Sequence, residues 1–348
     1  MVEHLPLTNV SRRCHPVIVA ALVTATAACG SGSPPASPTA AANDFHGQFN
    51  QLWSTFDRVY PYFDYKRIDW NALKAEFEPQ AAAAANENQL VTVLQPMLAR
   101  LHDQHVVLTG PGTTVRTYVP TDFINWNVDV WRQYLARANA LTRGAAVSAV
   151  MNGVAYIAVT SWNPNQLNVA DLDAFLDAFR DRPALIVDVR MNPGGDDSLA
   201  FQFAGRFATS TTTLGYVQFR SGPGHSDFTP LQARTFSPRG SFQFTRPVLL
   251  LVGRSCASST ESFIAGMREL PHVTLAGDRT GGATANPQTF MLGGGWSYSV
   301  SRWIEYTANM QVIEDQGIAP SVVVPASPAD FQSGRDPVLD WAIAALVR

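Results

Sequence analysis

Lysine is nearly absent from this sequence. Of the 25 basic residues, only Lys66 and Lys74 are lysines, and all the others are arginines. Charged residues make up 15% of the 348 residues, and the formal net charge is -3. A protein that binds nucleic acid carries a basic field, so this composition predicts no nucleic-acid partner. The low charged fraction and an aromatic fraction of 10% exclude a wholly disordered chain, and the length is enough to bury a large core.

The N-terminus has the pattern of an export signal. Arg12 and Arg13 precede a short apolar run over residues 16–28, which ends in small residues before Cys29. This run is shorter than the roughly 20 residues that a membrane-spanning helix needs. The small residues before the cysteine resemble a bacterial lipobox, in which the cysteine becomes the lipidated first residue of the mature protein. We therefore expect residues 1–29 to be a lipoprotein-type signal peptide, with an ordinary cleavable signal as the alternative.

Residues 30–44 continue as a flexible tether rich in Gly, Ser, Pro and Ala. The expected location is extracytoplasmic, in the bacterial cell envelope, anchored to the membrane through lipid on Cys29. Cys14 would leave with the signal, so Cys256 is left alone and no disulfide is expected. No Cys/His cluster has metal-ligand spacing, so the sequence predicts neither a metal site nor a cofactor.

The remaining chain changes character near residue 105. Apolar residues over 45–59 recur at three- and four-residue steps, and Asp69 is placed to cap a second helix, so residues 45–105 predict a helical subdomain. Over residues 106–348, short β-rich runs alternate with helical runs, which predicts an α/β domain with a largely parallel sheet. The runs at 184–188 and 248–252 are apolar throughout, as expected for buried central strands.

A first candidate for chemistry follows the strand at 248–252. The strand runs into a turn of small residues and then into a helix over 258–270. A nucleophile in such a turn lies at a helix N-terminus, where free N–H groups favour developing negative charge. Four side chains compete for this role, and a cluster of N-cap serines is the alternative. These candidates are Ser255, Cys256, Ser258 and Ser259.

Two further segments could complete such a site. The strand at 184–188 leads to Gly194 and Gly195, whose backbone freedom suits an oxyanion hole, although a plain turn is the alternative. His102 and His105 lie where the helical pattern gives way to a strand, and histidine is the usual general base for serine. The two rings share a face if the segment is helical and not if it is extended. A surface histidine pair is the alternative.

Together these segments resemble the tail-specific, or C-terminal-processing, serine peptidases. That superfamily also contains the tricorn core protease and the interphotoreceptor retinoid-binding protein. Four matching segments occur in the family's order: LHDQHVVL, ALIVDVRMNPGG, SCASSTESFIAGM, and AGDRTGGATANPQ through IEDQGIAPSVVV. The resemblance covers about residues 45–325. It implies a crotonase/ClpP-like α/β catalytic domain over residues 106–348, preceded by the small helical subdomain.

The resemblance assigns the nucleophile to Ser258, three residues before Glu261. The oxyanion donors fall on the backbone N–H of Gly194 or Gly195 and on that of Ser259. Glu261 is expected to serve the first turn of its own helix. Cys256 is expected to pack rather than react.

The general base for Ser258 is expected to differ from that of the bacterial processing enzymes, which use a lysine. Ala283 stands at that position, and no lysine follows Lys74. The tricorn-like branch uses a histidine and a glutamate instead, which map to His105 and Glu314. Gln104 stands where that branch has a serine linking these two residues, so Glu314 is expected to reach His105 directly or through Gln104. The stretch over 110–151 is too short for the PDZ module of the processing enzymes.

The resemblance thus implies a serine endopeptidase that hydrolyses exported or misfolded proteins or peptides through a Ser-His-Glu site. An α/β-hydrolase is disfavoured, because that fold needs its histidine after the acid, and only His272 follows Ser255. A non-catalytic ligand- or lipid-binding envelope lipoprotein on the same fold is the main alternative. A binder need not bring Ser258 and His105 within hydrogen-bond reach. An envelope scaffold protein has no specific signal in the chain, and the oligomeric state is not predicted.

Overall fold

The computed structural model describes residues 43–347. The predicted signal segment, the lipidation residue Cys29 and nearly all of the tether therefore lie outside the described residues. Within residues 43–347, no helix is both long enough and apolar enough to cross a membrane.

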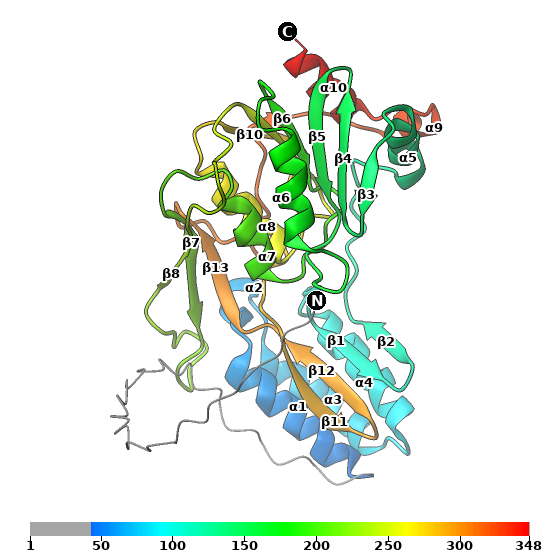
Figure 1. Ribbon diagram of the computed structural model, residues 1–348. Helices are drawn as coiled ribbons and strands as arrows, with labels where there is room; N and C mark the ends of the chain where they lie inside the picture. Colours follow the sequence, from blue (N-terminus) through cyan, green and yellow to red (C-terminus); the bar gives the residue numbers. More distant parts are fainter. Residues whose placement is uncertain (1–42, 348) are drawn as a thin grey trace, which may run out of the picture. The chain divides into compact units, whose positions relative to one another are not determined.

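Helices open this part of the chain, which confirms the helical prediction for the segment (Figure 1). They are α1 (Phe45–Val59), α2 (Phe63–Lys66), α3 (Trp70–Ala82) and α4 (Glu87–Ala99). Asp69 caps α3, as its position predicts, because its carboxylate accepts the N–H of Ala72. Asp44 and Asn86 cap α1 and α4 in the same way.

A seven-stranded sheet forms the centre of the α/β part. Its strand order is β14-β10-β9-β6-β5-β4-β3. Neighbours from β14 to β5 pair in parallel, and β4 and β3 add an antiparallel edge, so the largely parallel prediction is confirmed. The strands are β3 (Leu141–Arg143), β4 (Ala146–Met151), β5 (Val154–Val159), β6 (Leu185–Asp188), β9 (Val248–Val252), β10 (Val273–Gly277) and β14 (Val322–Val323).

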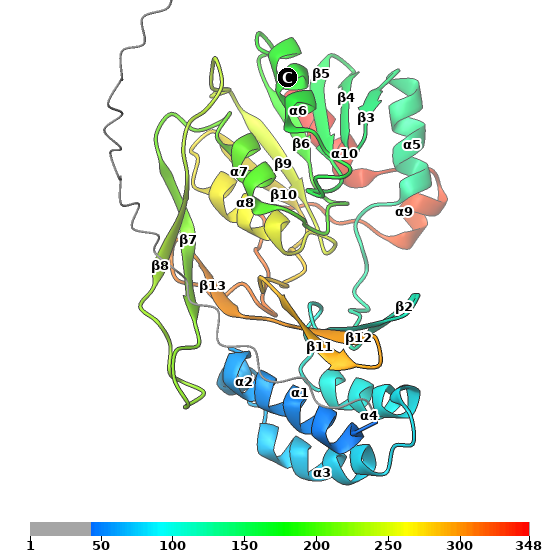
Figure 2. The ribbon, with the colours of Figure 1, turned by 60° about the horizontal axis from the view of Figure 1, so that its bottom comes forward.

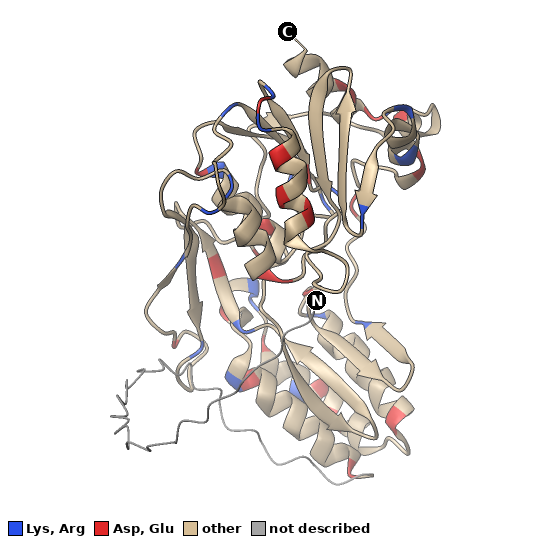
Figure 3. Ribbon diagram, in the orientation of Figure 1, with Lys and Arg blue, Asp and Glu red and all other residues tan. Residues whose placement is uncertain are grey.

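Helices cover both faces of this sheet (Figure 2). One face packs on α6 (Val169–Ala178), α7 (Asp197–Ala204) and α8 (Ser259–Arg268). The other packs on α5 (Val128–Arg137) and α10 (Pro337–Leu346), with α9 (Pro328–Gln332) preceding α10. Figure 3 shows almost no charged residue along the central strands, whereas several acidic residues lie on α6. Both faces of the strands are therefore buried in apolar layers, which explains their uninterrupted apolar sequence.

Two smaller sheets connect this layered part to the helical segment. The first has the order β11-β12-β1-β2 and contains β1 (Val107–Gly110), β2 (Thr113–Arg116), β11 (Gln288–Gly293) and β12 (Trp296–Val300). The second has the order β13-β7-β8 and contains β7 (Thr212–Phe219), β8 (Gln232–Phe236) and β13 (Trp303–Thr307). The four opening helices share one core with β1, β12 and β13. For example, Phe56 of α1 stacks on Tyr298 of β12, with ring centroids 5.9 Å apart.

Candidate active site

Ser258 lies at the start of α8, directly after the turn that follows β9. Its backbone has φ 56° and ψ -131°, a conformation that side-chain-bearing residues rarely adopt. Such strain persists only where the surroundings impose it, and it clusters at functional sites. Here the N–H of Ser258 donates to the carbonyl of Ala283 at 2.7 Å, which ties the strained residue to the loop over 280–284.

The structure separates the four candidate nucleophiles. Ser255 accepts a hydrogen bond from the indole of Trp126, and Ser259 donates to the carbonyl of Gly195. Cys256 is fully buried, and its burial raises the pKa of the thiol. The hydroxyl of Ser258, in contrast, makes no hydrogen bond to any residue in the range 43–347. Ser258 also lines a cavity of about 290 Å³.

That cavity is bounded by segments far apart in the sequence. They are the turn after β6, the start of α8, the loop before β11, and strand β13. Its lining includes Gly195, Ser258, Thr284, Trp303 and Glu305. A substrate side chain placed there would lie next to the Ser258 hydroxyl.

The double-glycine turn passes directly beside Ser258. Gly194 and Gly195 have φ values of 116° and 143°, and a Cβ on Gly194 would lie 2.7 Å from the Cβ of Ser258. The N–H of Gly194 donates to Asn192 Oδ1 at 2.9 Å and is therefore occupied. The N–H groups of Gly195 and Ser259 bond to nothing among the described residues. Of the two glycines proposed as oxyanion donors, Gly195 thus has the free N–H.

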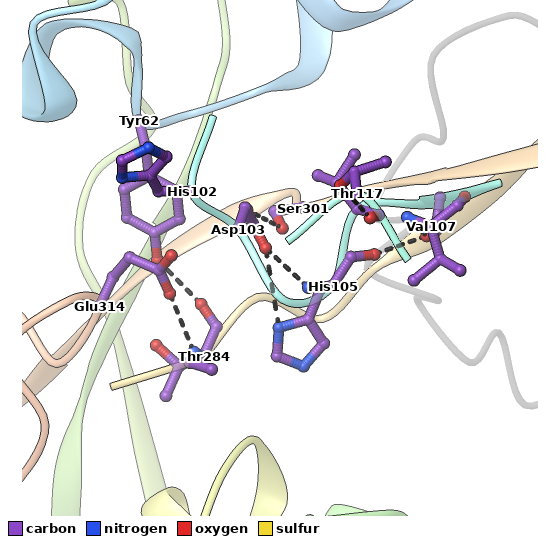
Figure 4. Close-up of polar contacts among 12 residues, drawn as sticks. Tyr62, His102, Asp103, His105, Val107, Thr117, Thr284, Ser301 and Glu314 are labelled. Atoms are coloured by element: carbon purple, nitrogen blue, oxygen red, sulfur yellow. Dashed lines mark hydrogen bonds and ion pairs between the residues drawn. The ribbon is translucent and has the colours of Figure 1, made fainter. Parts of the chain in front are cut away.

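His105 lies in the turn between α4 and β1 and is largely buried (Figure 4). Its backbone N–H donates to Asp103 Oδ1 at 2.8 Å, and its Nδ1 lies 3.9 Å from the same oxygen. This Nδ1 is buried and has no hydrogen-bond partner. Burial lowers the pKa of His105, which favours the neutral imidazole that a general base requires. No hydrogen bond joins Ser258 to His105 in this arrangement.

His102 has a different environment from His105. The segment is a turn rather than a helix or a strand, and His102 has a positive φ of 46°. Its exposed ring stacks on Tyr118 with centroids 5.2 Å apart. Asp103 between the two histidines is fully buried and accepts the hydroxyl of Ser301 at 2.6 Å. Across residues 43–347, no group of three or more His, Cys, Asp or Glu side chains is arranged to hold a metal ion.

Glu314 is buried but does not contact His105. Its Oε1 accepts Lys66 Nζ at 2.7 Å, and its Oε2 accepts the N–H of Thr284 at 3.1 Å. Gln104 makes no hydrogen bond within the described part of the chain, so neither expected link from Glu314 to His105 is present. Instead, the carboxylate pairs with the cation of Lys66.

Two buried residues near the site were not expected from the sequence. Lys66 belongs to the helical segment and therefore lies outside the α/β part of the sequence, which contains no lysine. Glu261 does not merely serve its helix: it is fully buried and accepts the N–H groups of Gly282 and Ala283 and the hydroxyl of Thr280. Burial raises the pKa of Glu261 to about 7. The signal available in the sequence was the position of Glu261, just before the apolar residues of α8, which suggests a buried carboxyl group.

Comparison with protein-family models matches two parts of the chain. The model for peptidase family S41 matches residues 153–324, and the model for the tricorn protease C1 domain matches residues 41–99. The chain is thus similar to peptidase family S41 over residues 153–324. The α/β part of the chain and its helical segment are each matched by a family model.

Individual proteins show the same similarity. A tricorn protease homologue of Streptomyces coelicolor is 32% identical over 167 residues, which are 47% of this chain and 13% of the relative. The carboxy-terminal processing protease CtpA of Bacillus subtilis is 24% identical over 175 residues, which are 49% of this chain and 35% of the relative. The chain therefore spans between 13% and 35% of the length of these two curated relatives.

Solved structures extend the match across the whole described fold. A structure from Parabacteroides merdae, assigned as a peptidase, has a TM-score of 0.78 and 29% identity, and covers 89% of this chain and 98% of its own. Mature CPAF has a TM-score of 0.66 at 10% identity, which shows the fold alone. The helical segment and the α/β part thus occur together in other members of this fold.

Proposed function

We propose that this chain is a serine endopeptidase in which Ser258 is the nucleophile. The observation that carries the proposal is the state of Ser258 itself. Its backbone is strained, its hydroxyl has no partner among the described residues, and it borders a cavity beside two free N–H groups. The match to peptidase family S41 over residues 153–324 and the similarity to carboxy-terminal processing proteases support the same reaction class.

The reaction would follow the usual course of acyl transfer. His105 removes the proton from Ser258, whose oxygen attacks the peptide carbonyl, and the N–H groups of Gly195 and Ser259 bind the oxyanion. His105 then protonates the leaving amine, and water releases the acyl group. Because catalytic hydrogen bonds are often formed only with substrate bound, the Ser258–His105 contact is expected to close on binding. Glu314 supplies negative charge to this region.

The test is cleavage of unfolded casein by the purified protein and by Ser258→Ala. We expect the variant to lose at least about 10³-fold in turnover, because no other candidate hydroxyl is free to attack. Ser255→Ala is the matched control, since Ser255 lies in the same turn with its hydroxyl bonded to Trp126, and it should retain activity. Equal cleavage by wild type and Ser258→Ala would reject the assigned nucleophile. Absence of cleavage in all three would favour the non-catalytic ligand- or lipid-binding alternative.

We also propose that the substrates are exported or misfolded proteins and peptides, met in the cell envelope. The support is the order of basic, apolar and small residues that ends at Cys29, followed by the tether. Incorporation of radiolabelled palmitate into the full chain, and its loss in Cys29→Ala, would test the lipid anchor. Export without labelling would indicate an ordinary cleavable signal.

A further inference from the structure

Lys66 is buried beside the candidate active site although it comes from the helical segment. Its side chain is 5% exposed, and Nζ lies 2.7 Å from Glu314 Oε1, 3.1 Å from Asp315 Oδ1 and 3.1 Å from the carbonyl of His102. An ammonium has three N–H donors, so these three acceptors satisfy it fully. Burial alone lowers the pKa of Lys66, but the neighbouring carboxylates of Glu314, Asp103 and Asp315 outweigh burial and raise it. Lys66 is therefore a permanent cation here.

This cation favours the ionised form of Glu314. The carboxyl group is 1% exposed, and burial raises its pKa well above the usual value, with Asp103 adding to the rise and Lys66 opposing it. Both oxygens accept hydrogen bonds from N–H donors, one from Lys66 and one from Thr284. An ammonium and an amide N–H both donate to this carboxyl group, and both donors favour its ionised form.

The ionised carboxylate is connected to the nucleophile through one loop. Glu314 holds the N–H of Thr284, and the preceding carbonyl, that of Ala283, accepts the N–H of Ser258 at 2.7 Å. Tyr62, four residues before Lys66, donates its hydroxyl to the carbonyl of Thr284 at 2.9 Å. The helical segment thus holds this loop from one side, while Glu261 on α8 holds it from the other. The strained backbone of Ser258 depends on that loop for its N–H acceptor.

We propose that Lys66 is a positioning residue of the serine site, acting through Glu314 and the 280–284 loop on Ser258. The inference rests on the proposed peptidase function. If Lys66 has this role, the short helix α2 is part of the catalytic apparatus, and the site is incomplete without the helical segment.

Replacing Lys66 with a neutral side chain has a defined consequence. Glu314 would then share a buried site with Asp103 and no cation, so it would take up a proton and lose its charge at neutral pH. Raising the pH through its elevated pKa removes that proton and restores the negative charge of Glu314, which strengthens the hydrogen bond from Thr284. The groups that face Glu314 are Lys66, Asp103, Asp315, Tyr60, Tyr62 and Tyr65, and Lys66 acts electrostatically on His105 as well.

The experiment measures casein cleavage and labelling of the nucleophile by a fluorophosphonate between pH 6 and pH 10. We expect Lys66→Met to lose about 10²-fold in both at pH 7, the cost typical of a misplaced reacting group, and to recover in part as the pH rises. Lys66→Arg should retain most activity. Lys74→Met removes the only other lysine, which lies over the ring of Trp53, and should behave as wild type.

A double variant keeps the test decisive if Lys66→Met does not fold. Lys66→Met with Glu314→Gln removes both charges, so it should fold, remain slow and show no alkaline recovery. A Lys66→Met enzyme with the wild-type rate, or one whose loss is equal at every pH, would overturn the positioning role. Persistent cleavage by Ser258→Ala would instead overturn the proposed function, so the two failures are distinguishable.

Discussion

The backbone around Ser258 is where single residues matter most. A serine with φ 56° is accommodated because Gly194, with no side chain, allows the opposing turn to pass against it. Gly194 itself has φ 116°, which residues with a Cβ adopt only under strain. The close approach and the dihedral angle both require glycine at this position.

We therefore expect Gly194→Ala to reduce turnover by about 10²-fold or more, because the new methyl would displace the nucleophile. The measurement is the casein-cleavage rate, with circular dichroism to verify folding. Gly112→Ala is the control: Gly112 also has a positive φ, of 69°, but nothing lies within 4 Å of its added Cβ. Equal rates for the two variants would contradict the argument.

At the scale of elements, a buried charge network ties α10 to the end of β6. Arg190 is fully buried and pairs with Asp188 at 2.8 Å and with Asp336 at 2.8 Å. Asp336 also caps α10 by accepting the N–H of Leu339. The turn that carries Gly194 follows Arg190 directly, so this network anchors one wall of the site from behind.

Asp336→Ala should lower the free energy of unfolding by about 3–5 kcal/mol, because it removes one partner of a buried ion pair together with a helix cap. Urea denaturation gives this quantity. Asp330→Ala is a suitable comparison, since Asp330 completes the capping box of α9 near the surface, and its loss should cost much less than that of Asp336. A similar cost at both positions would show that the buried network contributes nothing beyond capping.

At the scale of the whole molecule, the opening helices and the late strands form one core. Phe56 of α1 is fully buried and contacts Trp70 of α3 as well as Tyr298 of β12. Lys66 and Tyr62 add polar contacts across the same boundary. A core that is shared in this way couples the helical segment to the active site.

Phe56→Ala should accordingly destabilise the entire molecule, by about 3–5 kcal/mol. We expect helical circular dichroism and casein cleavage to be lost together in one thermal transition, at a temperature below that of wild type. Val323→Ala, at a position that is 68% exposed, should leave that transition unchanged. Separate melting of the two signals would indicate that the segments fold independently.

The sequence predicted the main helices and central strands, and the family resemblance singled out Ser258 among four candidate nucleophiles. Apolar periodicity identified the opening helices, the uninterrupted apolar runs identified β6 and β9, and Asp69 marked the start of α3. These signals are local, because they follow from the repeat of a helix or strand and from the capping of backbone N–H groups. The order of the four family-like segments indicated a resemblance to the tail-specific serine peptidases, and the model for peptidase family S41 matches residues 153–324.

Which side chains contact one another in the site followed from the packed fold. In the structure, the N–H of Gly194 donates to Asn192, and Glu314 pairs with Lys66 rather than with His105. Glu261 is buried and accepts hydrogen bonds from the 280–284 loop. Each of these contacts except the first joins segments distant in the chain. The choice of partner for a buried charge depends on burial and distance, which are properties of the packed fold and leave no periodic trace in a sequence.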